Sequence, residues 1–357
     1  SIPEQPSQAT FDLVNGGNGP LDYAMTIVYA GDESPDPWDS LGAVNVSQAT
    51  GDAMIQGVEF AGDTWYVSGT GNAGQPTLYR FDPHGAYVGS IPQPAGGIGW
   101  FDMAYDGQYL YGSEQRGSGG GLITGINLNG QVQTTIPSPV NPSRAIAYDP
   151  DSDHFWVADL STDIYEIARD GTIADQVPND GNPVLNITGL AWHEMEADGF
   201  KLLLFCNNGS GTQLWKMHPV SHDLQFVTTL TANQGDHAGG LAITPGWNST
   251  LLVLGGILQS PAGDRLGIYE VTFNTTWIDV SPMQAIVPGS QTQEVTVTFD
   301  PTYLRTDTYR VNLRIHSDVL DSTYVLPVVL DVVSGVPDAR HPGLPTVYAL
   351  YQNYPNP

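Results

Sequence analysis

Short runs of apolar residues alternate with turn-forming residues along most of this chain, and residues 144–178 give the pattern in its fullest form. Four runs follow one another there: AIAY, HFWVAD, DIYEIARDG and TIADQVP. They are rich in β-branched and aromatic residues and are separated by Asp, Pro, Ser or Gly, which is typical of β-strands joined by turns. The segment therefore predicts four short strands in succession.

The same group of four runs returns along the chain at residues 56–92, 101–137, 188–230 and, with only three runs, 239–274. A period of roughly 40 to 50 residues with four strands in each is typical of a β-propeller. The run LGAVNVS at 41–47 is a candidate for the missing fourth strand of the last group, because closing the ring removes an open sheet edge. We therefore predict an all-β fold with a five-bladed β-propeller over residues 38–274.

The segments on either side of the propeller carry a different pattern. FDLVNGGNGPLDY lies within residues 1–30, and WIDVSP, VPGSQTQEVTVTFD, TYRVNLRIHSD and VLPVVLDV lie within residues 275–333. Together they resemble the small immunoglobulin-like modules of secreted bacterial proteins, cut into two parts. The resemblance implies that the propeller is inserted in an immunoglobulin-like β-sandwich, since insertions are tolerated where loop ends lie close together. The alternative is a short N-terminal extension that packs on the propeller, with the sandwich merely flanking it.

The C-terminal segment, residues 334–357, ends in TVYALYQNYPNP. This string resembles the opening of the C-terminal sorting domain used by type IX secretion in Bacteroidetes-like bacteria, and it implies export followed by release or anchoring at the cell surface. The DST tripeptide around Ser322 resembles the O-glycosylation motif of the same bacteria. N-x-S/T sequons are also compatible with a secreted glycoprotein; they lie at Asn45, Asn186, Asn208, Asn248 and Asn274.

The charge of the chain narrows the range of partners. With 38 acidic and 11 basic residues its net charge is −27, which argues against nucleic acid or an anionic membrane as a partner. No apolar run has the ~18 residues of a membrane span. The single cysteine, Cys206, lies in the apolar run KLLLFCN, so we expect a buried, unreactive thiol.

Polar residues at the ends of the inner strands are the candidate ligand-binding residues, because in a propeller these ends meet around the central channel. The set consists of Asp102, Glu114, Arg144, Asp159, Asn207 and His237. Three of its carboxylates have the chemistry of a glycosidase, but the corresponding residues of other repeats are Gly, Ser and Asn. We therefore predict a channel face without catalytic residues.

A second candidate site has the D-x-D-x-D spacing of calcium loops, at Asp149, Asp151 and Asp153. The segment lacks the Gly at the sixth position and the Glu at the twelfth, and Asp is equally favoured in a tight turn for its own hydrogen bonds. Calcium is the one cofactor that the sequence suggests. Trp38, Trp100 and Trp247 fall in or beside predicted loops, where an aromatic ring can stack on a sugar.

These observations favour a non-enzymatic extracellular or cell-surface protein with a structural or adhesive role. The alternative is a secreted carbohydrate-binding propeller or a propeller glycosidase. Self-association is also predicted, because the immunoglobulin-like pattern begins late and leaves a groove without a strand. The tail at Leu344–Tyr354 alternates well enough to fill that groove in a neighbour; the alternative is that Ile2–Ala9 fills it within the chain.

Overall fold

The chain is described by a computed structural model that covers residues 6–332, with gaps at 31–36, 72–73, 118–119, 161, 180–183, 185, 209–210, 231–234, 302–303, 305 and 319. Residue contacts divide it into two compact units. The first unit combines segments from both ends of the chain, Ser1–Ser34, Ser249–Leu251 and Phe273–Pro357. The second unit comprises Pro35–Asn248 and Leu252–Thr272. The C-terminal segment with the sorting-domain string lies outside the described residues.

Almost all regular structure is antiparallel β-sheet, as the sequence predicts: the described strands form six sheets of four strands and one of three. One short helix, α1 (Val46–Thr50), is described, and Asn45 caps it by accepting a hydrogen bond from the Gln48 N–H at 2.9 Å. No helix in the described part of the chain is long and apolar enough to span a membrane.

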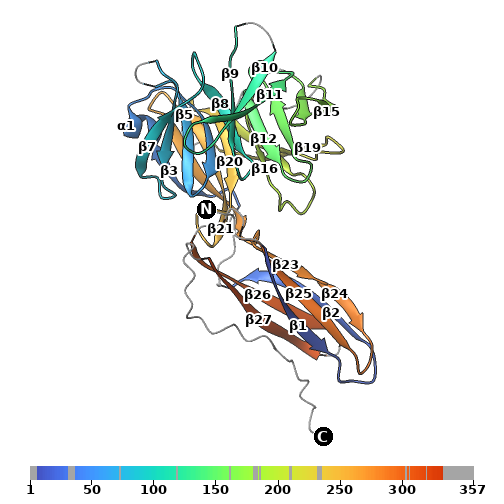
Figure 1. Cartoon of the computed structure of the whole chain (residues 1–357). Helices are drawn as coiled ribbons and strands as arrows, with labels where there is room; N and C mark the ends of the chain where they lie inside the picture. Colours follow the sequence, from blue (N-terminus) through green and yellow to red (C-terminus); the bar gives the residue numbers. More distant parts are fainter. Residues whose placement is uncertain are drawn as a thin grey trace. The chain divides into compact units, whose positions relative to one another are not determined.

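Four sheets of the second unit consist of consecutive strands (Figure 1). The first contains β4 (Ile55–Ala61), β5 (Thr64–Gly69), β6 (Thr77–Phe81) and β7 (Tyr87–Pro92). The second contains β8 (Trp100–Tyr105), β9 (Leu110–Glu114), β10 (Gly121–Ile126) and β11 (Val132–Ser138). The third contains β12 (Ala145–Asp149), β13 (His154–Ala158), β14 (Ile164–Ile167) and β15 (Ile173–Val177). The fourth contains β16 (Ile187–Trp192), β17 (Leu202–Asn207), β18 (Thr212–Met217) and β19 (Leu224–Thr229).

The fifth sheet joins strands from distant parts of the sequence. It contains β20 (His237–Thr244), β21 (Leu251–Gln259), β22 (Arg265–Phe273) and β3 (Ser40–Asn45), in that order. Val44 of β3 lies opposite Leu266 of β22. The prediction that residues 41–47 supply this fourth strand is confirmed, although the strand ends at Asn45 because α1 begins at the next residue.

The first strands of the five sheets contact one another in sequence: β4 contacts β8, β8 contacts β12, β12 contacts β16, β16 contacts β20, and β20 contacts β4. Their backbones approach so closely that some positions have no room for a side chain. A Cβ on Gly57 would lie 2.7 Å from the Phe101 carbonyl oxygen, and one on Gly239 would lie 2.5 Å from that of Gln56. Glycine is therefore required where β4 passes β8 and β20.

Contacts between successive sheets repeat at the turn between the third and fourth strands. The glycines of three such turns have φ values of 86°, 86° and 84° at Gly85, Gly130 and Gly171. A Cβ at each would meet a residue on the fourth strand of the preceding sheet: Val44 of β3, Ile91 of β7 and Pro137 of β11. Strand β3 thus has the same contact with the first sheet that β7 and β11 have with the second and third.

The apolar cores of the second unit also lie between successive sheets. One cluster joins Tyr111 of the second sheet to Phe155 of the third, and another joins Phe205 of the fourth to Leu254 of the fifth. Further clusters join the first sheet to the second and the third to the fourth. Each sheet is therefore stabilised by burial of apolar surface against its neighbours.

The first unit contains two sheets built from both ends of the chain. The three-stranded sheet has the order β1 (Ser7–Val14), β25 (Thr292–Phe299), β23 (Ile278–Ser281). The four-stranded sheet has the order β24 (Gln284–Val287), β2 (Leu21–Tyr29), β26 (Asp307–Ser317), β27 (Leu320–Val332). Phe11 of β1 lies opposite Val295, and Met25 of β2 lies opposite Ile315.

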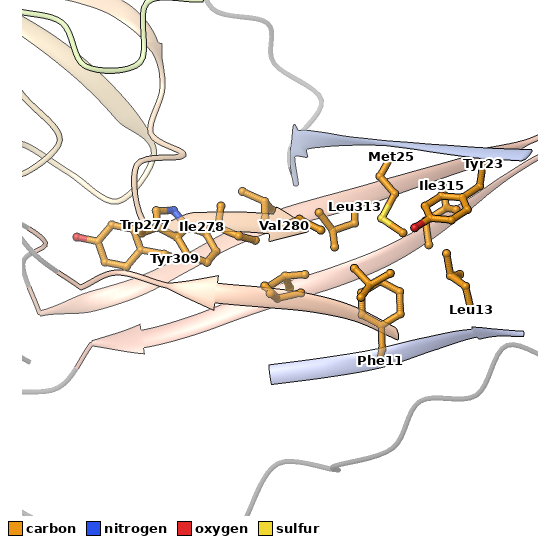
Figure 2. Close-up of a cluster of buried hydrophobic side chains, with 14 of the residues drawn as sticks. Phe11, Leu13, Tyr23, Met25, Trp277, Ile278, Val280, Tyr309, Leu313 and Ile315 are labelled. Carbon is orange, nitrogen blue, oxygen red and sulfur yellow. The ribbon is translucent and has the colours of Figure 1, made fainter. Parts of the chain in front are cut away.

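A single apolar core joins these two sheets (Figure 2). Alternate residues of each strand face it, such as Phe11 and Leu13 on β1 and Tyr23 and Met25 on β2. Trp277 is fully buried, and its Nε1–H donates a hydrogen bond to the Asn274 carbonyl at 3.1 Å. The N-terminal strands are therefore part of the same core as the C-terminal strands.

Candidate functional site

Residues from the starts of the five first strands surround a small hollow in the second unit. Its lining consists of Gln56, Phe101, Arg144, Thr188, Ala238, Gly239 and Gln259. The cavity volume is about 30 Å³, which holds roughly one or two water molecules. An organic substrate can touch the mouth of this hollow but does not fit inside it.

Arg144 is the one charged residue in the lining of this hollow. Its guanidinium carbon lies 3.9 Å from the centre of the Phe101 ring, and its Nε donates to Asp159 Oδ1 at 2.8 Å. Both side chains of the ion pair are about one-fifth exposed. The structure thus brings together two of the predicted channel-face residues, in an arrangement that fixes the arginine at the mouth.

Asp102 is fully buried, which contradicts its assignment to an accessible ligand-binding face. Its Oδ2 accepts hydrogen bonds from the N–H groups of Ile146 and Leu190 at 3.1 and 3.0 Å, and its Oδ1 accepts one from Leu241 at 3.1 Å. These donors lie on β12, β16 and β20, so one carboxyl group from β8 connects three other first strands. Burial raises the pKa of Asp102 well above its usual value, and its hydrogen bonds with backbone N–H groups oppose that shift.

Two of the other predicted channel-face residues, Glu114 and Asn207, bind different backbone groups. The Glu114 carboxylate accepts a hydrogen bond from the Gly96 N–H. The Asn207 amide accepts from the Ala238 N–H at 2.7 Å and donates to the carbonyl of the same residue at 3.3 Å. His237 is exposed at the first position of β20. The three candidate carboxylates, Asp102, Glu114 and Asp159, are thus bound to different groups.

The aspartates of the predicted calcium loop also have separate partners. Asp149 accepts hydrogen bonds from the Asp151 N–H and the Ser152 hydroxyl at 2.8 and 2.9 Å. Asp151 pairs with Lys201, and Asp153 pairs with Arg169 at 2.7 Å. Within the described residues, no group of three or more His, Cys, Asp or Glu side chains could hold a metal ion. The turn and ion-pair roles account for all three side chains.

The sequon asparagines differ in their surroundings. Asn274 is only 3 % exposed and accepts a hydrogen bond from the Thr276 hydroxyl, so the folded chain does not present it for glycosylation. Asn45 caps α1, while the amides of Asn186 and Asn208 donate to the Asn207 carbonyl and to Gln213. Asn248 is half-buried, and the Ser322 side chain lies outside the described part of the structure.

Of the three tryptophans expected near loops, Trp100 is buried as the first residue of β8. Trp38 is half-buried against an apolar cluster of the second unit. Trp247 lines a second hollow, of about 230 Å³, beside the edge strand β3. Its lining is Leu41, Gly42, Ala43, Val44, Trp65, Pro83, His84, Gly85, Trp247 and Ile268. Trp65 is buried, and its Nε1–H has no hydrogen-bond partner among the described residues.

The sequence did not predict the polar roles of the Gln56–Gln259 pair or of Glu59. Gln56 and Gln259 lie beside each other at the first hollow, where the Gln259 amide donates to the Ile55 carbonyl at 2.7 Å and to Gln56 Oε1 at 3.3 Å. On β4, burial raises the pKa of Glu59 to about 8. The sequence signal that could have identified Gln56 is its position next to Gly57, at the start of a first strand. The alternating pattern contains no comparable signal for Glu59.

The expected buried thiol is confirmed: Cys206 is buried, and burial raises the pKa of its thiol to about 12.

No protein-family model and no curated protein matches the chain. Solved structures that resemble it include the crystal structure of a protein of unknown function from Bacteroides caccae. That protein is 14 % identical, and the alignment covers 66 % of this chain and 82 % of that one, with a TM-score of 0.36. The strand pairing of the chain itself shows an all-β protein of small antiparallel sheets.

Proposed function

We propose that this protein is a non-enzymatic, secreted structural or adhesive protein that associates with copies of itself. In this proposal the five sheets of the second unit are the blades of a β-propeller, which is supported by the succession of contacts among their first strands and by the repeated turn contacts between sheets. The two sheets of the first unit are an immunoglobulin-like sandwich into which the propeller is inserted, supported by the shared core of N-terminal and C-terminal strands.

The observation that carries a structural rather than a catalytic role is the use of the polar groups around the first strands. Asp102 binds three backbone N–H groups, Asp159 binds Arg144, and Glu114 binds a backbone N–H. A glycosidase needs two accessible carboxyl groups on either side of a sugar bond. A central carboxyl group without access to solvent supports a role in holding strands together instead.

Secretion is proposed from the resemblance of the C-terminal string to a type IX sorting domain and from the net charge of −27. A strongly acidic chain is repelled by anionic surfaces and by nucleic acid. Extracellular glycan or protein surfaces are therefore the partners proposed for an adhesive role. Measuring where the full-length protein accumulates, with and without residues 346–357, tests the sorting role of that segment.

The absence of catalysis is tested by incubating the protein with a panel of polysaccharides and measuring the release of reducing ends. We expect no release above background. Hydrolysis by the wild type that disappears in Glu114→Gln and Asp159→Asn variants, but persists in an Asp170→Asn control, would show instead that the protein is a glycosidase.

Carbohydrate binding without catalysis is the second candidate function, and the hollow beside β3 is the observation that favours it. Trp247 is half-buried and provides aromatic surface, and His84 together with the edge of β3 provides polar groups. Titration with an oligosaccharide selected on a glycan array tests it. Binding that falls at least tenfold in Trp247→Ala, but not in Trp215→Ala on the fourth sheet, supports this candidate; no glycan binding by the wild type excludes it.

A further inference from the structure

The two sheets of the first unit have unequal numbers of strands, and the missing strand has a defined place. β23 is an end strand of the three-stranded sheet, and β24 is an end strand of the four-stranded sheet. Only two residues, Pro282 and Met283, join them, so the two sheets have these end strands along the same edge of the shared core. The opposite side is formed by β1 in the three-stranded sheet and by β27 in the four-stranded sheet. Placing the sheets face to face in this order leaves β27 without an opposing strand among the described residues.

Burial along β27 agrees with this gap. Leu326, Leu330 and Val332 pack against the core but are only half-buried, and Val328 between them is 9 % exposed. By comparison, Val311 and Leu313 on the neighbouring β26 are 1 % and 0 % exposed. On β1, Ala9 has the same orientation along the strand as Phe11 and Leu13 but is exposed. A further strand beside β1 would cover these residues, and burying a half-exposed aliphatic side chain is favourable.

The backbone of β1 is suited to receive such a strand. The Asn15 N–H donates to the Gln291 carbonyl of the residue opposite at 2.9 Å. Because hydrogen-bonded and non-hydrogen-bonded pairs alternate in an antiparallel ladder, residues 13, 11, 9 and 7 also bond to β25. The N–H and C=O groups of the residues between them therefore point away from β25; these residues are Gln8, Thr10, Asp12 and Val14.

The outer edge of β27 is less suited, because Pro327 has no N–H group. Proline within a sheet occupies an edge position with its nitrogen turned away from the neighbouring strand. It thus interrupts the row of donors on the free edge of β27 and protects that edge against pairing. No described strand pairs with the free edge of β1, and its row of donors is continuous.

We infer that the edge of β1 accepts a strand from a second copy of this chain, and that the donated strand is Leu344–Tyr354. The inference rests on the proposed self-association and names its site. The donor sequence, LPTVYALYQNY, is rich in the β-branched and aromatic residues that favour strands, and the eleven residues 333–343 that join it to β27 can span up to about 36 Å. Strand addition in one direction from copy to copy gives an open filament unless the rotation closes a ring.

The experiment compares full-length wild type with Thr10→Pro and its matched control Thr10→Val, using sedimentation over a range of concentrations and thermal unfolding of each. Proline removes an outward N–H of β1 without removing a hydrogen bond to β25, and valine retains the N–H and the β-branched shape. We expect concentration-dependent assembly of the wild type and of Thr10→Val, and at least tenfold weaker assembly of Thr10→Pro with a similar unfolding temperature.

A second measurement does not depend on how well Thr10→Pro folds. A chain ending at residue 343 is expected to remain monomeric and to bind a synthetic peptide of residues 344–354, and Thr10→Val in the same background is expected to bind it equally well. Assembly that survives removal of the tail would overturn the inference. A monomeric wild type whose unfolding temperature falls on tail removal would also overturn it, because it would show that each chain fills its own site. Neither result depends on the hydrolysis assay, so failure of this inference is distinguishable from failure of the non-enzymatic role.

Discussion

The two units of this protein treat their sheet edges in opposite ways. In the second unit, β7, β11 and β3 each lie against a glycine turn of the next sheet. Strand β15 contacts the next sheet in another way, through a hydrogen bond between Asp175 and His222, which lies between β18 and β19. In the first unit, β1 and β27 have free edges within the described structure, and part of the core beside them is only half-buried. The comparison teaches that one chain can combine a unit in which successive sheets cover one another with a unit that leaves two strand edges unpaired among the described residues.

The largest effect is expected from the carboxyl group at the centre of the second unit. Asp102→Ala leaves three buried N–H groups on β12, β16 and β20 without an acceptor. At about 1–3 kcal/mol for each unpaired group, we expect at least about 3 kcal/mol of destabilisation, measured by urea unfolding.

Asp102→Asn sharpens this prediction, because the amide retains one acceptor oxygen and is expected to cost less than alanine. Asp170→Ala, which removes one exposed turn hydrogen bond from the Thr172 N–H, serves as the control and should lose no more than about 1 kcal/mol. An Asp102→Ala protein as stable as this control would mean that the carboxyl group does not hold the first strands together.

The second effect concerns Glu59, whose pKa is raised from 4.5 to about 8 by burial. The unfolded chain loses this proton near pH 4.5, whereas the folded chain keeps it until about pH 8. Folding therefore takes up a proton between these values, and the contribution of Glu59 to stability falls as pH rises from about 4.5 through 8.

Glu59→Gln removes this titration. We expect the unfolding temperature of the variant, relative to wild type, to increase between pH 4.5 and 8, by at least about 2 °C in total, and to change little outside that range. Differential scanning calorimetry of both proteins from pH 4 to 9 measures it. A constant difference across this range would show that Glu59 titrates normally in the folded chain.

The smallest effect tests the contact between β3 and the first sheet. Gly85→Ala places a Cβ against Val44 at a φ of 86°, while Gly97→Ala places one in open space at a φ of 61°. In both variants the alanine must adopt a left-handed conformation, which costs about 1 kcal/mol. Only Gly85→Ala adds a steric clash. We expect Gly85→Ala to lose about 1–2 kcal/mol more than Gly97→Ala, measured by urea unfolding; equal losses would mean that the turn does not pack tightly on β3.

Much of the strand arrangement is predictable from local sequence. Alternating runs and the Gly or Asp turns PHG, LNG and RDG locate the strands, and the repeat phase identifies residues 41–47 as an outer strand. The role of Asp102 is not predictable in the same way. A polar residue at the start of an inner strand predicts a side chain accessible at the channel. The N–H groups that Asp102 binds instead lie 44, 88 and 139 residues away in the sequence, so local sequence does not reveal them. The burial of Trp100 likewise depends on Gly112 of the next strand, against which its ring packs.

The pairing of β3 with β22 also constrains the order in which the chain folds during synthesis. Residues 40–45 leave the ribosome before four complete sheets have been made, and they find their partner only after Arg265–Phe273 has emerged. β1 and β2 likewise cannot pair until their partner strands, β25 and β26, have been synthesised. Pairing over such sequence distances slows folding, and we expect the exposed early strands to depend on chaperones until synthesis is nearly complete.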